Sequence, residues 1–391
     1  MSYSKLFSKR AQALKSSVIR EILKVTANPQ VISFAGGLPS PEGFPVAQMK
    51  AAFDAVLSND PKSVLQYSTT DGYAPLREWV ANRVSVNGAV ITPDQVIMVS
   101  GSQQALDLIG KVLIDEGDKV LVETPTYLGA LQAFSLFNPN FVSLASDEDG
   151  LDADKISAQD AAGAKFLYAL PNFQNPTGRM MTEARRASLV AKAREHDLLV
   201  VEDDPYGELW YEAAPPPSLL SRMPERVILM GSFSKVLAPG LRLGYIVAPV
   251  EIARKIEQAK QATDLHTSTV IQRAVYEVVK DGFLDEHIPR VRALYKKQAH
   301  AMIKALETHM PAGVTWNQPA GGMFLWVTLP EGMDAERLLE QAFARNIAYV
   351  PGAPFFANAV QSNTLRLAFV TVPEATIDAG IKVLAQVFAQ Q

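Results

Sequence analysis

One lysine in the second half of the chain lies among residues that could hold a phosphate group and react with an aldehyde. Lys235 follows the apolar run 227–230, which predicts a buried strand. Ser232 and Ser234 lie close by, and Arg242 follows the lysine. Hydroxyl and guanidinium groups bind phosphate oxygens, and an amine forms a Schiff base with an aldehyde. This combination points to pyridoxal phosphate, although a polar surface loop with an ordinary lysine gives the same pattern.

A second candidate phosphate site lies earlier in the chain. Residues 95–99 predict a strand, Ser100-Gly-Ser-Gln-Gln104 predicts a turn, and residues 105–114 predict an apolar-periodic helix. This order directs backbone N–H groups and the positive end of a helix dipole at a phosphate. A serine that caps the helix explains the same residues. The motif therefore supports a phosphate site only in combination with the first candidate site.

Polar side chains follow two other predicted strands. Asn175 comes after the run 165–170, and Asp203 and Asp204 end the next buried run, with Tyr206 just beyond. Open α/β sheets bind ligands at the carboxyl ends of their strands. One aspartate could therefore meet the protonated nitrogen of a pyridine ring and keep that ring able to accept electrons. The alternatives are a simple turn at Asn175 and aspartates that cap a helix or face solvent.

Each of two further side chains has two interpretations, one as a ligand-binding residue and one as a structural residue. Tyr127 follows a strand that begins at Val120 and could stack on a flat ring or pack in a core. Arg366 lies in an alternating segment and shares a face with Thr364 and Ala368. A guanidinium among apolar residues is costly unless it is paired. We expect it to bind a substrate carboxylate, with an ion pair inside the protein as the alternative.

Regular alternation of elements predicts the first domain. Strand patterns at 141–144 and 165–169 alternate with helical patterns at 127–136 and 152–160, and a helix is expected at 182–195. Such alternation is typical of a doubly wound α/β domain.

The pattern changes in the last third of the chain, which is mostly helical from about residue 250. A long amphipathic helix is predicted at 283–308, and the segments that follow it do not alternate regularly. This irregular order predicts an α+β domain. The segments are strands at 321–327, 348–350 and 364–369 and a helix at 334–345.

Composition excludes several kinds of site. The chain has 391 residues, which favours a large domain and a smaller one. A net charge of −4 argues against nucleic acid as the main partner. The absence of cysteine excludes disulfides, thiolate zinc sites and cysteine nucleophiles. The histidines, such as His196 and His266, show no ligand spacing, and no apolar run approaches the length of a membrane span.

The N-terminal segment has two interpretations. It is basic and acid-poor, as a transit peptide can be. However, Phe7, Ala11, Leu14 and Val18 fall on one helical face, so we expect a retained helical arm and a cytoplasmic protein.

The segment 31–45 is a short β-prone run that enters a loop rich in glycine and proline. Gly36 and Gly37 allow close backbone approach, so the loop either connects elements or closes over a ligand. Pro45 is predicted as the first residue of a helix that runs to about Leu57.

Taken together, the motifs resemble those of the fold-type I, class I/II aminotransferases that use pyridoxal phosphate. The motifs Glu202-Asp-Asp-Pro-Tyr206 and Gly231-Ser-Phe-Ser-Lys235 are most similar to those of the 2-aminoadipate and kynurenine aminotransferase branch. The resemblance covers nearly the whole chain, in the family's order. The other matching segments are Ala35-Gly-Gly-Leu-Pro39, Gln66-Tyr-Ser68, Ser100-Gly-Ser-Gln-Gln104, Asn175-Pro-Thr-Gly178, Arg242 and Arg366.

The resemblance implies a fold and domain boundaries. A large doubly wound, mainly parallel seven-stranded sheet domain should span residues 46–280, and a smaller α+β domain should span 281–391. Residues 1–45 should form an arm that packs against the small domain and the partner subunit of a homodimer.

The resemblance also implies a role for each site residue. Lys235 should be the Schiff-base lysine and the group that moves the proton, with Asp203 as the partner of the pyridine nitrogen. Asn175 and Tyr206 should bond the phenolic oxygen of the ring, and Tyr127 should stack on it. Phosphate contacts should come from Ser102, Gln103, Ser232, Ser234 and Arg242. The substrate should contact Arg366 through its α-carboxylate, and otherwise Asn175, Arg20, Gly37 and, from the other subunit, Tyr67.

The implied reaction is the transfer of an amino group from an L-amino acid to a 2-oxo acid by a ping-pong mechanism, with 2-oxoglutarate as the expected acceptor. A lyase or decarboxylase on the same fold would use the same lysine. A ligand-sensing module is the other alternative, because some transcription regulators contain this fold. Such regulators normally add an N-terminal DNA-binding domain, whereas only a short arm precedes the glycine loop here.

Overall fold

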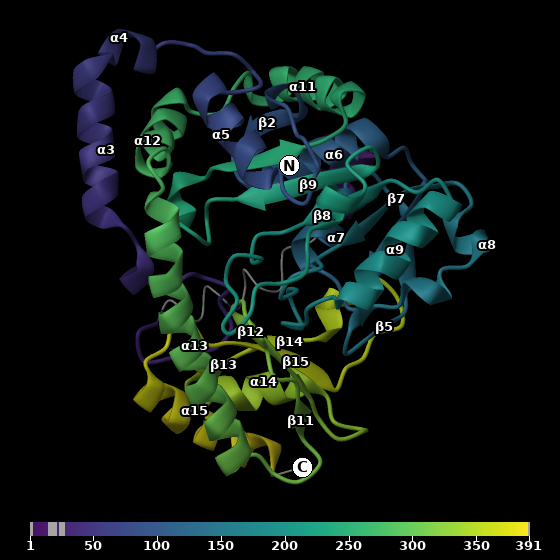
Figure 1. The fold of residues 1–391 in the computed structure, drawn as a ribbon. Coiled ribbons are helices and arrows are strands. Elements are labelled where there is room, and N and C mark those ends of the chain that lie inside the picture. Colours follow the sequence, from purple (N-terminus) through teal and green to yellow (C-terminus); the bar gives the residue numbers. More distant parts are fainter. Residues whose placement is uncertain (1–2, 15–21, 23–27, 390–391) are drawn as a thin grey trace.

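The computed structural model describes residues 3–14, 22 and 28–389, and a seven-stranded sheet forms its larger part (Figure 1). The strand order is β2-β10-β9-β8-β7-β3-β4, and β10 alone runs antiparallel to its neighbours. This sheet confirms the predicted α/β class. The strands are β2 (Val96–Val99), β3 (Lys119–Glu123), β4 (Asn140–Leu144), β7 (Ala164–Ala169), β8 (Val200–Asp203), β9 (Val227–Ser232) and β10 (Gly244–Val247).

Both faces of this sheet are covered by helices, because its strands are apolar on both sides. On β2, for example, Val96 and Met98 belong to one core cluster, whereas Ile97 and Val99 belong to another. This is the doubly wound arrangement that the alternation predicts. The first face carries α5 (Ala74–Val84), α9 (Glu183–Glu195) and α12 (Thr269–Val279), and the second carries α6 (Ser102–Leu113), α7 (Leu128–Ser135) and α11 (Val250–Asp264).

A smaller antiparallel sheet lies below the large one in Figure 1. Its order is β11-β12-β15-β14, with β11 (Thr315–Trp316), β12 (Phe324–Thr328), β15 (Thr364–Ala368) and β14 (Val350–Pro351). The helices α13 (Phe283–His309), α14 (Ala335–Phe343) and α15 (Glu374–Phe388) accompany it.

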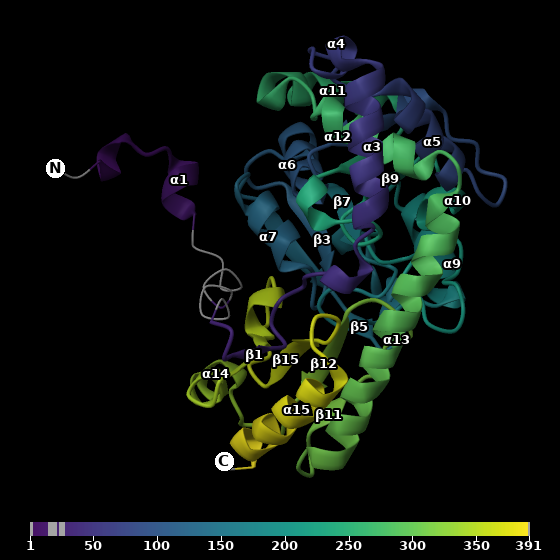
Figure 2. The ribbon, with the colours of Figure 1, turned by 90° about the vertical axis from the view of Figure 1, so that its left-hand side faces the viewer.

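Helix α13 joins the two parts of the molecule. Near its start, Leu284 and Ile288 lie in a core of the large sheet, whereas Tyr295 and Met302 lie in the core of the small sheet. One continuous helix therefore supports both sheets and holds them together, as Figure 2 shows along its length.

The N-terminal helix is shorter than predicted. Helix α1 (Lys9–Ala13) begins after Ser8, whose hydroxyl accepts a hydrogen bond from the Ala11 N–H, so Phe7 lies outside the helix. Leu14 is extended, and both Phe7 and Leu14 are exposed. The predicted face therefore does not form within the described residues, and Val18 lies outside them. Figure 2 shows α1 beside the main body, where the Arg10 guanidinium lies 5.8 Å from the ring centre of Phe137.

The loop after this segment is fixed by a strand that joins distant parts of the chain. β1 (Ile32–Ser33) pairs in parallel with β13 (Ile347–Ala348). The predicted strand at 348–350 was therefore wrong as one element, since Ala348 and Val350 belong to different sheets.

Two other predictions also need correction. Residues 152–160 form no continuous helix, because the Ser157 side chain caps a new helical turn, α8 (Ala158–Ala161). Pro45 precedes α3 (Val46–Asn59) as its N-cap instead of opening it. The remaining short elements are α4 (Pro61–Val64), α10 (Leu219–Arg222), the hairpin β5 (Ser146–Asp147) and β6 (Gly150–Leu151), and the 3-10 turns at Ser4–Leu6, Pro41–Gly43, Pro93–Gln95, Ala153–Lys155, Pro239–Leu241 and Ala353–Phe355.

Candidate active site

Lys235 lies just past the end of β9, between the two sheets. Its ammonium donates a hydrogen bond of 2.9 Å to the carbonyl oxygen of Gly37 and lies 5.9 Å from the ring centre of Tyr206. Burial, together with the positive charges of Arg366 and Arg242, lowers the pKa of the Lys235 amine to about 8. A substantial share of this amine is therefore neutral, and hence nucleophilic, near physiological pH.

Asp203 ends β8 with one carboxylate oxygen bound and the other free. The Tyr168 hydroxyl donates a 2.6 Å hydrogen bond to Oδ2, whereas Oδ1 is buried without a partner among the described residues. Burial raises the pKa of Asp203 to about 7. A buried, unpaired carboxylate oxygen fits a cationic N–H group, such as that of a protonated pyridine ring.

The neighbouring Asp204 is already satisfied within the protein. Its two oxygens accept hydrogen bonds from the Asn172 side chain (2.9 Å) and the Gly207 N–H (2.8 Å). Glu202, on the other side of Asp203, accepts from the backbone N–H groups of Leu219 and Leu220. Of these three acids, only Asp203 has an oxygen free for a ligand in the described part of the chain.

Sheet topology brings the two candidate phosphate motifs together. In β10, Gly244 pairs with Val99 on one side and with Ser232 on the other. The turn before α6 and the turn after β9 therefore flank the start of β10, where Arg242 lies. Arg242 has a left-handed backbone (φ 48°), and its guanidinium donates to the Ser100 carbonyl oxygen at 3.5 Å.

Gly101 allows this close approach. Its φ of +87° favours glycine, and a Cβ atom at this position would lie 2.6 Å from Nη2 of Arg242. The guanidinium thus lies against the backbone that leads into α6, whose first residue is Ser102. Of the other predicted phosphate ligands, Gln103 donates weakly to the Gly129 carbonyl (3.4 Å), and Ser232 Oγ accepts from the Ser234 N–H (3.1 Å). Guanidinium, hydroxyls and a helix N-terminus together fit an anionic group.

Arg366 is a buried guanidinium that no carboxylate neutralises in the part of the chain the structure describes. Nη1 donates to Oδ1 of Asn175 (2.7 Å) and Nη2 to the Ala35 carbonyl oxygen (2.6 Å), whereas Nε has no partner. The guanidinium also stacks 4.4 Å from the ring centre of Phe324. The described residues therefore do not form the internal ion pair that was the alternative prediction. The guanidinium of Arg366 can still bind an anion.

Asn175 and the two predicted tyrosines lie at the same site. Burial raises the pKa of Tyr206, and a hydrogen bond with Asn175 partly opposes this shift. Burial also raises the pKa of Tyr127, which responds to the charges of Asp203 and Arg366. Both phenols therefore remain protonated and able to donate hydrogen bonds at neutral pH.

Of the predicted substrate residues that the structure describes, Tyr67 is not brought into this site within the single chain. Tyr67 is 78% exposed, and its ring lies edge-on to that of His266 at 5.9 Å. Arg20 lies outside the described residues. Gly37, by contrast, is at the site through its carbonyl contact with Lys235, and a Cβ there would lie 3.1 Å from the Phe324 ring.

Sequence reasoning missed three contributors. Tyr168 supports Asp203, the Ala35 carbonyl supports Arg366, and Phe324 packs between Tyr206 and Arg366. The alternation of β7 indicates which residues share a face with Tyr168. Only the pairing of β7 with β8, in which Tyr168 lies opposite Val201, brings its hydroxyl within reach of Asp203. Within residues 3–14, 22 and 28–389, no group of acids and histidines could hold a metal ion, and no helix is long and apolar enough to cross a membrane.

The fold and the site together define a class of protein. A mainly parallel seven-stranded sheet, with a smaller α+β part and a lysine after an inner strand, is the architecture of fold-type I pyridoxal-phosphate enzymes. The site fits that cofactor, because Asp203 Oδ1 is unpaired, Lys235 has a lowered pKa and Arg242 adjoins the N-terminus of α6.

Comparison with known proteins gives the family. The family model for aminotransferase class I and II matches residues 30–384. Aromatic-amino-acid aminotransferase 1 of Thermococcus litoralis is 46% identical over 402 aligned positions, which cover 100% of this chain and 96% of that protein. The 2-aminoadipate transaminase of Thermus thermophilus is 45% identical, covering 99% of this chain and 97% of that protein.

A solved structure agrees with these relatives. The alpha-aminoadipate aminotransferase of Thermus thermophilus, complexed with N-(5′-phosphopyridoxyl)-L-leucine, has a TM-score of 0.92 and 43% identity, covering 100% of this chain and 99% of that one. The chain belongs to the class I and II aminotransferases, a family of pyridoxal-phosphate-dependent enzymes.

Proposed function

We propose that this protein transfers the amino group of an L-amino acid, of the 2-aminoadipate, aromatic or branched-chain type, to 2-oxoglutarate by a ping-pong mechanism. The observation that carries the proposal is the buried guanidinium of Arg366. It has no anionic partner among the described residues and lies close enough to Lys235 to lower the pKa of its amine. A carboxylate-bearing substrate would supply the missing anion. The names of the similar enzymes support the aromatic and 2-aminoadipate donors in this range.

Each site residue has a role toward the cofactor. When bound, pyridoxal phosphate supplies an aldehyde that takes up amino groups and a cationic ring that accepts electrons from the substrate. Asp203 would hold the ring N–H through its free oxygen, Tyr127 would cover the ring, and Asn175 and Tyr206 would hydrogen-bond its phenolic oxygen. Phosphate contacts would come from Ser102, Gln103, Ser232, Ser234 and Arg242.

Lys235 is the group that would move the proton at the substrate α-carbon. With a pKa of about 8, its amine can be free to accept a proton and can also hold one. The charge of Arg366 contributes to this low value. A substrate carboxylate on Arg366 would cancel part of that charge, and the pKa of Lys235 would then rise as substrate binds. Substrate binding would thus strengthen the base when it is needed.

The remaining assignments belong to the same proposal. We infer a homodimeric, cytoplasmic enzyme in which Tyr67 completes the site of the other subunit, while Gly37 and Arg20 shape the side-chain pocket. The exposure of Tyr67 in the single chain supports the first of these assignments. We also propose an N-terminal arm at residues 1–45, a large cofactor-binding domain at 46–280 and a small C-terminal domain at 281–391.

A panel of amino donors with 2-oxoglutarate tests this function. Glutamate and the matching oxo acid should form in equal amounts, and Arg366→Lys should lower kcat/KM for all donors by a similar factor, because lysine cannot form the planar two-pronged contact. A loss of about ten- to a hundredfold is expected for one charged hydrogen-bond pair. Carbon dioxide or ammonia released without glutamate would indicate a lyase or decarboxylase. A protein that binds amino acids without turnover would indicate a sensing module.

A further inference from the structure

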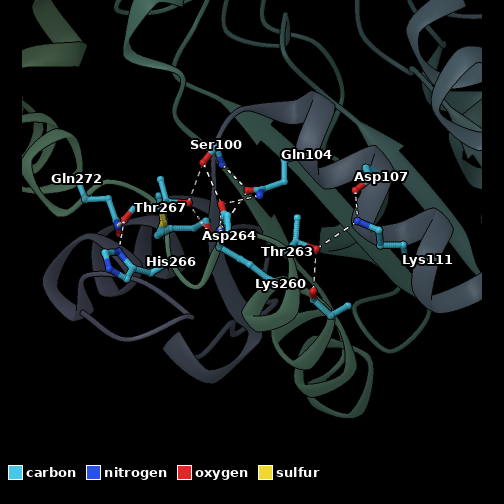
Figure 3. A network of polar contacts seen from close by, with 12 residues as sticks. Ser100, Gln104, Asp107, Lys111, Lys260, Thr263, Asp264, His266, Thr267 and Gln272 are labelled. Carbon is cyan, nitrogen blue, oxygen red and sulfur yellow. Dashed lines mark hydrogen bonds and ion pairs between the residues drawn. The ribbon is translucent and has the colours of Figure 1, made fainter. Parts of the chain in front are cut away.

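The side chain of Lys260 is fully buried on the outer side of the phosphate motif. It lies in α11, one turn before the helix ends at Asp264. Its ammonium donates to both carboxylate oxygens of Asp264, at 2.7 and 2.9 Å, and to Oε1 of Gln104 at 3.2 Å (Figure 3). All three ammonium hydrogens thus have an acceptor within the protein.

Gln104 connects this ion pair to the turn before α6. Its Oε1 accepts a 2.8 Å hydrogen bond from the Ser100 N–H, and its Nε2 donates a 2.6 Å bond to Asp264. The Ser100 hydroxyl lies 3.4 Å from both Asp264 Oδ2 and Thr267 Oγ1. Figure 3 shows these side chains converging on Ser100 from α6, from α11 and from the loop after it.

Ser100 is thereby held from two directions. Gln104 fixes its N–H, and Arg242 donates to its carbonyl oxygen. The next residues are Gly101, which leaves room for Arg242, and Ser102, which begins α6. The orientation of the Ser100–Gly101 peptide therefore sets where the first N–H groups of α6 and the Arg242 guanidinium point.

Stabilisation of the fold does not by itself explain this ion pair. The ammonium of Lys260 is fully removed from water and the carboxylate of Asp264 partly so, which carries a desolvation cost. Replacing a buried ion pair by apolar side chains is often neutral or stabilising. Burial accordingly lowers the pKa of Lys260. The pair instead fixes the orientation of the Gln104 side chain, because several hydrogen bonds hold it in one rotamer.

We propose that Lys260, Asp264 and Gln104 are positioning residues that hold the Ser100–Ser102 turn in the geometry that binds a phosphate group. This inference rests on the proposed function only in taking that turn as the phosphate site. Gln104 and Asp264 hydrogen-bond to Ser100, and none of the three residues is among the expected phosphate ligands. They would act through Ser100 and determine how strongly the protein prefers a phosphorylated cofactor to its unphosphorylated form.

The test compares Lys260→Met with Lys111→Met. Lys111 forms the same type of ion pair, with Asp107 at 2.6 Å, and also connects α6 to α11 through Thr263, but it lies near the far end of α6. The affinities of each apoenzyme for pyridoxal phosphate, pyridoxal and inorganic phosphate are measured by titration, together with thermal melting. A double variant, Lys260→Met with Asp264→Leu, avoids leaving the carboxylate unpaired.

We expect both variants at Lys260 to bind pyridoxal phosphate and inorganic phosphate about tenfold more weakly, roughly the value of one charge-assisted hydrogen bond, with pyridoxal affinity unchanged. Lys111→Met should change none of the three affinities. If the Lys260 variants weaken pyridoxal as much as pyridoxal phosphate, or bind both like wild type, the inference is overturned while the proposed function stands. If wild type itself does not prefer pyridoxal phosphate to pyridoxal, both fail.

Discussion

At the scale of the residue, Asp203 and Asp204 have the same chemistry but different surroundings. Both oxygens of Asp204 are engaged by Asn172 and Gly207, whereas Asp203 has a free one. Asp203→Asn should lower transamination by more than about a hundredfold with cofactor still bound, because loss of the electron-accepting ring exceeds the ~1 kcal/mol of one neutral hydrogen bond. Asp204→Asn should mainly lower stability. Steady-state kinetics and absorbance of both variants test this, and a mild Asp203→Asn beside a damaging Asp204→Asn would mean that the wrong carboxylate has been assigned.

The raised pKa of Asp203 also predicts a pH dependence of apoenzyme stability. In the unfolded chain this carboxyl titrates near pH 4, whereas burial raises its folded pKa to about 7. Between these values the folded state binds more protons, so the stability contributed by this group is present below about pH 4 and is lost as the pH rises through 7. Asp203→Asn cannot become charged and should escape this loss.

Thermal melts of the two apoenzymes at pH 5 and pH 8 measure the effect. The difference in melting temperature, variant minus wild type, should be larger at pH 8. A constant difference across this range would show that Asp203 does not titrate there.

How far single residues could be predicted depended on whether their partners are close in sequence. Lys235 and Asn175 were singled out because each follows a strand that the apolar pattern reveals. That pattern left Asp203 and Asp204 open, and the family resemblance selected Asp203. Tyr168 was missed because its role arises from pairing β7 with β8, which places residues far apart in the chain side by side. The unpaired state of Arg366 could likewise be seen only in the structure, since hydrogen-bond capacity depends on every neighbour.

At the scale of the element, one methyl group added in the turn before α6 should have a large effect on cofactor affinity. Gly101→Ala would place a Cβ atom 2.6 Å from the Arg242 guanidinium at a φ of +87°. The variant should therefore bind pyridoxal phosphate more weakly, because Arg242 or the turn must move. Gly88→Ala is the matched control, since its φ is +85° and a Cβ there meets nothing within 4 Å.

Titration of both apoenzymes with pyridoxal phosphate separates the two effects. Backbone strain alone would lower the stability of both variants without a specific loss of cofactor affinity. Equal affinity in Gly101→Ala and Gly88→Ala would argue against a phosphate site at Arg242.

Elements were predicted well where one pattern extends over a whole segment, as in α9 and α13. Prediction was wrong where a single side chain or a change of sheet interrupts the pattern. Ser157 divides the predicted helix at 152–160, and the backbone between Ala348 and Val350 passes from one sheet to another. Such interruptions depend on local hydrogen bonds and tertiary pairing, which hydrophobic periodicity does not contain.

At the scale of the whole molecule, exposed apolar side chains point to a second subunit. Leu65, Tyr67 and Leu265 are all exposed in the single chain, and the Tyr67 ring lies edge-on to that of His266. We expect a dimer in solution, in which Tyr67 enters the partner's site. Mixing Tyr67→Ala with Lys235→Ala, both inactive, should restore about a quarter of wild-type activity, since half of the dimers would be hybrids with one intact site each.

Sedimentation and activity measured on the same mixtures check this prediction. Absence of recovery, despite demonstrated exchange of subunits, would place Tyr67 in its own subunit's site or outside any site. Each variant mixed with itself supplies the baseline.

The most direct test of the account is to find which lysine carries the cofactor. Purified holoenzyme is reduced with borohydride, digested, and its peptides are mapped by mass spectrometry, with Lys235→Ala as the control. If Lys235 carries the cofactor, the wild-type protein yields a pyridoxyl group on this residue and the variant yields no labelled peptide. Label on a different lysine, or equal labelling of the variant, would contradict this assignment.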